Sequence, residues 1–153
     1  MTVSSFASIT EILAFAIQRE IEAAEGYAKI AKMATAAALR ELAEDLRLQE
    51  VEHRRLLEGL KGTSFAQIEA SKVPDLHIVD DLADEPVAAD MSIQDMLIFA
   101  AKKEAQAVTL YESLAGLPEG SEHRNLFLFL AGQEREHKLR IEAEYEKQIL
   151  PEN

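Results

Sequence analysis

The hexapeptide QEVEHR at residues 49–54 returns as QEREHK at residues 133–138, which is 84 positions further along the chain. In both copies a glutamate stands three residues before a histidine, so a helix would present the two side chains on one face. The second glutamate of each copy directly precedes the histidine and would point away from that face. We therefore expect two equivalent helices, each with a Glu-x-x-His pair.

The same offset extends to the segments that precede the two hexapeptides. SITEILAFAIQREIEAAEGYAKIA at 8–31 aligns without a gap with SIQDMLIFAAKKEAQAVTLYESLA at 92–115. Apolar residues recur at helical spacing throughout, and the alternation typical of strands is absent from the sequence pattern. The chain therefore reads as two copies of one helical hairpin.

The fold class that follows is all-α. We predict four helices, over residues 8–34, 36–60, 92–116 and 121–150, with Ser8, Ser92 and Ser121 as N-caps. A connection over about 61–91 is long enough to carry the chain from one end of a bundle to the other. We expect one domain, residues 1–153, formed by a four-helix bundle of two repeated hairpins joined by this long crossover.

Composition excludes several classes of partner and cofactor. The net charge of −12 would repel nucleic acid and anionic membrane surfaces. No cysteine occurs, so a bound metal must use oxygen and nitrogen ligands. The apolar stretch near the N-terminus is interrupted by charged residues, which argues against a signal peptide or a membrane span. We expect a cytoplasmic protein.

Helix geometry places four carboxylates at one level of the bundle. Glu20 and Glu50 lie equally far from the expected turn near Thr35, and Glu104 and Glu134 lie equally far from the second turn. Burying four acids is unfavourable unless positive charge balances them. Two divalent cations would do so, and oxygen-rich ligation with one histidine per ion suits iron or manganese better than copper or structural zinc. The candidate ligands are Glu20, Glu50, His53, Glu104, Glu134 and His137.

Other residues have more ordinary interpretations. We expect Glu52 and Glu136 to face solvent or a neighbouring chain, and Phe15 and Phe99 to lie in the core. His77 and His123 lack an acid at the same spacing, and we expect both to meet solvent.

With these motifs, residues 8–149 resemble the ferritin-like superfamily, and within it the rubrerythrin and bacterioferritin branch. The resemblance implies that Glu20 and Glu104 are terminal ligands, that Glu50 and Glu134 bridge two metals, and that each histidine binds one metal. It also implies that Tyr27 and Tyr111 hydrogen-bond ligand carboxylates.

The sequence departs from rubrerythrin at two features. Ala107, mirrored by Ala23, stands where rubrerythrin has a further ligand glutamate, and the small side chains would leave room for an oxidant. The absence of cysteine excludes a cysteine-ligated rubredoxin centre in this sequence, so an external electron donor would be needed.

The resemblance implies a di-iron oxidoreductase that oxidises Fe(II) with, or reduces, dioxygen or hydrogen peroxide, in the manner of a peroxidase or ferroxidase. Manganese or zinc could replace iron. The alternatives are a non-catalytic metal-binding or iron-storage accessory protein, a di-iron hydroxylase of an organic substrate, and a purely structural bundle. We expect a homodimer.

Overall fold

The computed structural model describes residues 9–67, 91–117 and 123–149, and every long element in these ranges is a helix. The helices are α1 (Ile9–Met33), α2 (Ala37–Glu58), α4 (Ile93–Ala115) and α5 (Arg124–Ile149). The all-α prediction is confirmed, and each observed boundary that can be compared lies close to the predicted one. The proposed caps Ser8 and Ser121 and most of the crossover lie outside the described residues.

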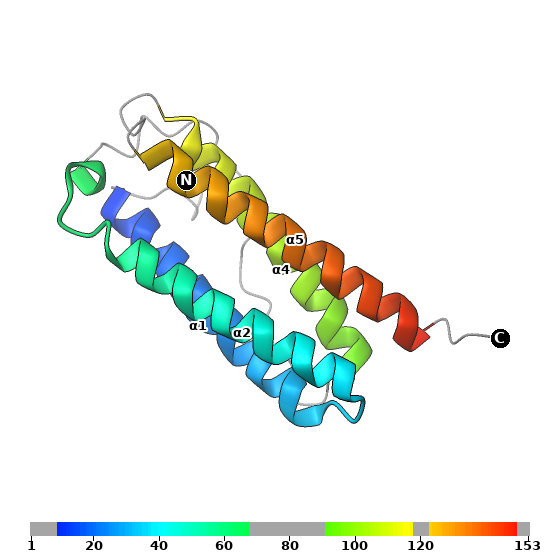
Figure 1. Ribbon diagram of the computed structural model, residues 1–153. Helices are drawn as coiled ribbons and strands as arrows, with labels where there is room; N and C mark the ends of the chain where they lie inside the picture. Colours follow the sequence, from blue (N-terminus) through cyan, green and yellow to red (C-terminus); the bar gives the residue numbers. More distant parts are fainter. Residues whose placement is uncertain (1–8, 68–90, 118–122, 150–153) are drawn as a thin grey trace, which may run out of the picture.

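The four long helices form two hairpins that face each other. α1 packs along α2, and α4 packs along α5, as Figure 1 shows. Contacts between the hairpins join α1 to α4 and α2 to α5, and they are sparser than the contacts within each hairpin. The prediction of a four-helix bundle built from two hairpins is therefore confirmed.

Local sequence explains where α4 begins but supplies no side-chain cap for α2. Ser92 precedes α4 with an extended backbone, and its hydroxyl accepts a hydrogen bond from the Asp95 amide at 3.1 Å. This is the predicted cap, and it satisfies one of the free amides of the first turn. Ala36 takes the equivalent place before α2 with a similar backbone, but it offers no side-chain acceptor.

The apolar core is divided into two clusters along the bundle. One contains the start of α1 and the end of α4, with Leu13, Leu110 and Phe127 among its fully buried side chains. The other contains the end of α1 and the start of α2, with Ile30 and Leu39. In every long helix the candidate ligands fall between the residues of these two clusters. The core therefore encloses a polar layer at mid-height.

A short 3₁₀ helix, η1 (Ser64–Gln67), follows α2 within the segment predicted as a connection. Gly62 allows the chain to turn there with a φ of 80°. Phe65 is 1% exposed and packs against Phe127 with ring centroids 5.2 Å apart. The Thr10 hydroxyl donates to the Ala66 carbonyl at 3.0 Å. This segment therefore closes one end of the bundle.

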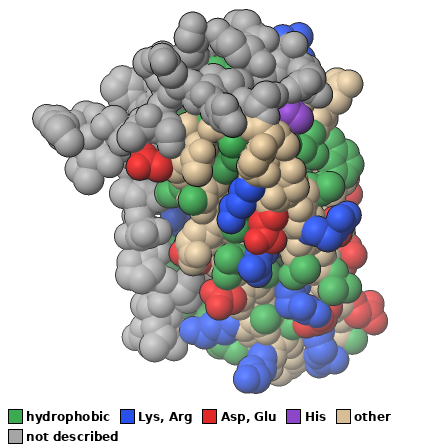
Figure 2. All heavy atoms as spheres, turned by 90° about the vertical axis from the view of Figure 1, so that its left-hand side faces the viewer, with side chains coloured by type: hydrophobic (Ala, Val, Ile, Leu, Met, Phe, Trp, Pro, Cys, Tyr) green, Lys and Arg blue, Asp and Glu red, His purple; other side chains and the backbone are tan. Residues whose placement is uncertain are grey.

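Figure 2 shows the face of the molecule that lies on the left-hand side of Figure 1. Over the described residues of this face, basic and acidic side chains are intermixed, with apolar side chains between them. No continuous basic area is visible among the described residues on this face. None of the described helices is both long enough and apolar enough to cross a membrane.

Candidate metal centre

All six predicted ligand side chains meet in the polar layer between the two apolar clusters. Each is at most 2% exposed, and two of the six, Glu50 and His137, are fully buried. They form two groups in which one ligand atom per residue lies within 4.8 Å of the others. The first group is Glu20, Glu50, His53 and Glu134, and the second is Glu50, Glu104, Glu134 and His137.

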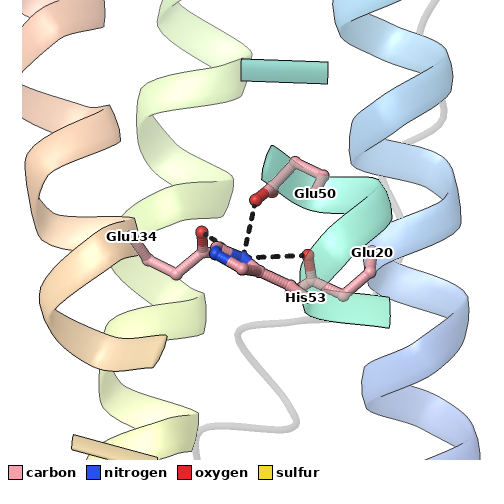
Figure 3. Close-up of side chains that lie close together, drawn as sticks. All are labelled: Glu20, Glu50, His53 and Glu134. Atoms are coloured by element: carbon pink, nitrogen blue, oxygen red, sulfur yellow. Dashed lines mark ion pairs between the residues drawn. The ribbon is translucent and has the colours of Figure 1, made fainter. Parts of the chain in front are cut away.

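The first group converges on His53, as Figure 3 shows. The distances from His53 Nδ1 are 3.0 Å to Glu50 Oε1, 3.3 Å to Glu134 Oε1 and 3.6 Å to Glu20 Oε2. Glu20 comes from α1, Glu50 and His53 from α2, and Glu134 from α5 on the opposite hairpin. One histidine nitrogen and three carboxylates therefore share one small space.

The second group repeats this arrangement around His137. Its Nδ1 lies 3.1 Å from Glu104 Oε2, 3.2 Å from Glu134 Oε1 and 3.4 Å from Glu50 Oε1. The two histidine rings are stacked, with centroids 5.6 Å apart. Glu50 and Glu134 belong to both groups, so the two groups share two carboxylates.

Several buried polar atoms in this layer lack a hydrogen bond of good geometry, which fits a role as metal ligands. Glu20 Oε2, both carboxylate oxygens of Glu50, Glu134 Oε1 and His53 Nδ1 are buried without a hydrogen bond of good geometry among the described residues. Buried polar atoms are rarely left unpaired, because desolvation without a partner is costly. These oxygen and nitrogen atoms are the donors that iron, manganese or zinc accepts. The site therefore fits bound divalent metal.

The pKa values show how the cluster holds protons when no cation balances it. Burial acts to lower the pKa of His53, but Glu134 and Glu20 outweigh it and raise that pKa to about 10. Burial likewise acts to lower the pKa of His137, but the neighbouring Glu104 and Glu134 outweigh it and raise that pKa to about 9. Burial and the charge of Glu134 raise the pKa of Glu104 to about 8. Protons therefore supply the charge that metal ions could supply.

The two shared carboxylates, Glu50 and Glu134, differ in their pKa shifts. Burial, followed by the charges of Glu104 and Glu20, raises the pKa of Glu50 well above its usual value. For Glu134, the effect of burial is outweighed by its close contacts with His137 and His53, so its pKa is lowered. Of the two shared carboxyl groups, Glu50 is therefore favoured in its neutral form and Glu134 in its charged form.

Both predicted tyrosines border the cluster, and they differ in their contacts. The Tyr111 hydroxyl donates a hydrogen bond of 2.5 Å to Glu20 Oε1, which belongs to the other hairpin. The Tyr27 hydroxyl is buried without a hydrogen bond of good geometry. Burial and the neighbouring Glu104 raise the pKa of Tyr27 well above its usual value, so this hydroxyl stays protonated.

Two glutamines beside the ligands were missed by the sequence interpretation. Gln49 Oε1 lies 2.7 Å from His137 Nε2, and Gln133 Oε1 lies 3.3 Å from His53 Nε2. Each glutamine therefore contacts the histidine of the opposite hairpin. The signal was present, because both glutamines open the repeated hexapeptides, but a repeat alone does not show which histidine each one meets.

The remaining predictions have mixed outcomes. Glu52 and Glu136 are exposed, as predicted. Phe15 and Phe99 are only half-buried, so neither is a fully buried core residue, although Phe15 packs against the first apolar cluster. Lys103 Nζ lies 5.3 Å from the Phe99 ring centroid. His123 is half-buried rather than solvent-facing, because its ring contacts the edge of Phe65.

The alanines at the two positions where the repeat lacks a further glutamate differ in their burial. Ala107 is 1% exposed within the first apolar cluster, and Ala23 is half-buried against the second. The equivalent alanines are therefore not packed alike. His77 lies outside the described residues.

Fold and site together define an all-helical bundle with a buried carboxylate and histidine cluster that could bind metal. A solved structure of a hypothetical protein from Pyrococcus furiosus is similar, with 30% sequence identity and a TM-score of 0.70. The match covers 92% of this chain and 89% of that chain, and the chain belongs to the same family as that protein. Neither a scan of family models nor a search of curated proteins gave a match.

Proposed function

We propose that the protein is a di-iron carboxylate oxidoreductase of the ferritin-like type, related in its site to rubrerythrin and bacterioferritin. The observation that carries the proposal is the sharing of Glu50 and Glu134 between two groups of buried ligands. Four carboxylates balance two divalent ions, and each group has one histidine. This ligand set matches the known di-iron pattern of a glutamate from two helices and Glu-x-x-His from the other two.

Each ligand has a definite role in this proposal. Glu20 and Glu104 would hold one ion each, Glu50 and Glu134 would bridge the ions, and His53 and His137 would each bind one ion through Nδ1. Tyr111 keeps the Glu20 carboxylate oriented by donating to Oε1.

When bound, two ferrous ions would supply two electrons, which with two protons reduce one hydrogen peroxide to two water molecules. The surrounding apolar clusters exclude bulk water from the layer. An external donor would return the electrons, because the sequence has no cysteine for a thiolate electron-transfer centre. Dioxygen is the alternative oxidant.

The test is anaerobic loading with Fe(II), followed by addition of oxygen or peroxide and measurement of the near-ultraviolet absorption of protein-bound ferric iron. Glu50→Ala removes a shared ligand and is expected to abolish the signal. Glu52→Ala is the matched control, because Glu52 lies on the same helix but is exposed and pairs with Arg55. Iron oxidation no faster than in buffer would contradict the enzyme function.

A non-catalytic metal-binding or storage-accessory protein is the second candidate, supported by the same ligand geometry. Metal analysis of purified protein, combined with turnover measured at known occupancy, separates the two functions. Full occupancy without turnover would favour the second.

We also propose a homodimer. Leu48 on α2 and Leu139 on α5 are 57% and 62% exposed and point away from the bundle interior, which supports an apolar contact between copies. Analytical ultracentrifugation of the wild-type protein and Leu48→Glu/Leu139→Glu would test it. A monomeric wild-type protein would contradict this proposal.

A further inference from the structure

A chain of polar contacts links one of the two buried histidines to the protein surface. His137 Nε2 lies 2.7 Å from Gln49 Oε1, and Gln49 Nε2 donates to Asp45 Oδ2 at 3.0 Å. Arg140 NH1 donates to the same Asp45 oxygen at 2.8 Å. These polar contacts thus connect α2 and α5 and end in an exposed ion pair between Asp45 and Arg140.

The other half of the molecule lacks the outer part of this chain. The internal offset of 84 residues equates Asp45 with Phe129 and Arg140 with Leu56. Neither side chain can donate or accept a hydrogen bond. Gln133 therefore has no carboxylate at the equivalent position, and its contact with His53 is longer, at 3.3 Å. The two hairpins therefore match in their candidate ligands, but among the described residues only the glutamine beside His137 is hydrogen-bonded to an acid.

Asp45 fixes the orientation of the Gln49 amide. Only the NH₂ group of a glutamine can donate to a carboxylate, so the amide oxygen must face His137. Hydrogen bonding to Arg140 holds the pKa of Asp45 below its usual value and keeps it charged. An oxygen facing His137 Nε2 requires that nitrogen to carry the hydrogen, which leaves the Nδ1 lone pair for a metal.

Gln133 is not fixed in this way. Without an acid at position 129, either end of its amide can face His53, and an NH₂ group there would favour the tautomer whose Nδ1 carries the hydrogen. Binding a metal at His53 must then select one amide orientation and one tautomer. This selection lowers the affinity of His53 for metal. At His137 the amide orientation and the tautomer are already fixed in the folded protein, so metal binding there has no such cost.

From this asymmetry we infer that Asp45 and Arg140 are positioning residues that make the two metal subsites unequal. The subsite of Glu50, Glu104, Glu134 and His137 binds its ion first and more tightly. The subsite of Glu20, Glu50, His53 and Glu134 fills second. This inference rests on the proposed metal binding and adds the order of loading and the residues that set it.

Zinc titration followed by NMR tests the order directly. The sequence contains four histidines, so protein labelled with ¹⁵N-histidine gives few ring signals. His53→Gln and His137→Gln variants assign the two signals of interest. With the first equivalent of Zn²⁺, the His137 signals should change to their bound positions before those of His53 change.

Calorimetric titration of variants then tests the cause. Asp45→Asn is expected to weaken the first zinc-binding step by about tenfold, the range seen for groups that support metal ligands, and to bring the two steps together. Phe129→Asp places a carboxylate four residues before Gln133 and is expected to tighten the second step. Glu52→Gln, which alters an exposed ion pair on the same helix, should leave both steps unchanged.

Stability provides a separate readout, because an exposed ion pair contributes little to folding. Asp45→Asn should therefore unfold at nearly the wild-type temperature before zinc is added, although its zinc affinity is reduced. Two results would overturn the inference and leave the proposed function intact. One is zinc binding to the two subsites of the wild-type protein together or in the reverse order, and the other is an unchanged first zinc-binding step in Asp45→Asn. Failure of the wild-type protein to bind zinc would overturn both.

Discussion

At the scale of single residues, the hydroxyl of Tyr111 should contribute more to metal affinity than the hydroxyl of Tyr27, its equivalent in the first hairpin, because it donates a hydrogen bond to Glu20. Tyr111→Phe keeps the packed ring but leaves Glu20 Oε1 without its donor. We expect the metal affinity of the group that contains Glu20 to fall by about tenfold, with little change in folding. Calorimetric titration with Zn²⁺ or anaerobic Fe²⁺ measures this effect.

Tyr27→Phe is the matched control for Tyr111→Phe. The Tyr27 hydroxyl makes no hydrogen bond of good geometry, so its removal should change metal affinity less. Equal losses in the two variants would show that the hydrogen bond is not the cause.

The ionisable ligands should release protons when metal binds. His53, His137 and Glu104 have pKa values of about 10, 9 and 8, so all three are mainly protonated near neutral pH in the absence of metal. A ligand nitrogen or carboxylate must lose its proton to bind, so apparent affinity should rise with pH until these groups are deprotonated. Titrations in buffers of different ionisation enthalpy count the released protons. Binding without proton release would contradict these protonation states.

At the scale of helices, the start points of α4 and α2 provide a test of capping. Ser92 accepts a hydrogen bond from the first turn of α4, whereas Ala36 leaves the first turn of α2 uncapped. Ser92→Ala should lower the free energy of unfolding by about 1 kcal/mol, and Ala36→Ser should raise it by a similar or smaller amount. Urea denaturation of both variants measures these changes. A stabilising Ser92→Ala would contradict the assigned cap.

The sequence predicted most of the helical architecture because helix periodicity acts locally. The spacing of Glu50 and His53 determines that they share a face, and equal distances from a turn determine the level of Glu20 beside them. The segment containing η1 lacks such a pattern, because a single 3₁₀ turn is too short to show a period. Its position depends on Phe65 packing against the bundle end.

Contacts between the hairpins could not be predicted in the same way. Tyr111 reaches Glu20, and each hexapeptide glutamine reaches the histidine of the other hairpin, Gln49 to His137 and Gln133 to His53. These pairings depend on how one hairpin is rotated and placed against the other. A repeat shows that the two halves are alike, but it does not show which groups cross between them.

At the scale of the whole molecule, the buried acids lower the stability of the fold unless protons or cations balance their charge. In each hairpin, apolar clusters on both sides of the polar layer stabilise the bundle, while the layer itself requires protons or cations. The same residues that are suited to bind metal therefore weaken the fold when neither is available. This conflict between folding and function explains why six polar side chains lie where apolar residues would pack more simply.

The conflict predicts how stability depends on pH before metal is added. The pKa of Glu104 rises from 4.5 to about 8, and those of His53 and His137 rise from 6.5 to about 10 and 9. A raised folded-state pKa means that the folded protein binds more protons, so the associated stability is present below the unfolded value and is lost as pH rises through the folded value. The lowered pKa of Glu134 acts oppositely, but its stabilisation is lost only as pH falls below 4.5.

We therefore expect the melting temperature in the presence of a chelator to fall as pH rises from about 6 to about 9. Divalent metal should reverse this fall, because ions replace the lost protons, and free metal at about 100 times its Kd adds about 2.7 kcal/mol. Circular dichroism melting curves with metal and with chelator measure both effects. Glu20→Gln/Glu104→Gln replaces two of the four acids with neutral amides and should show a smaller dependence on pH and on metal. A chelated wild-type protein that becomes more stable over this range would show that the buried layer is not held by protons.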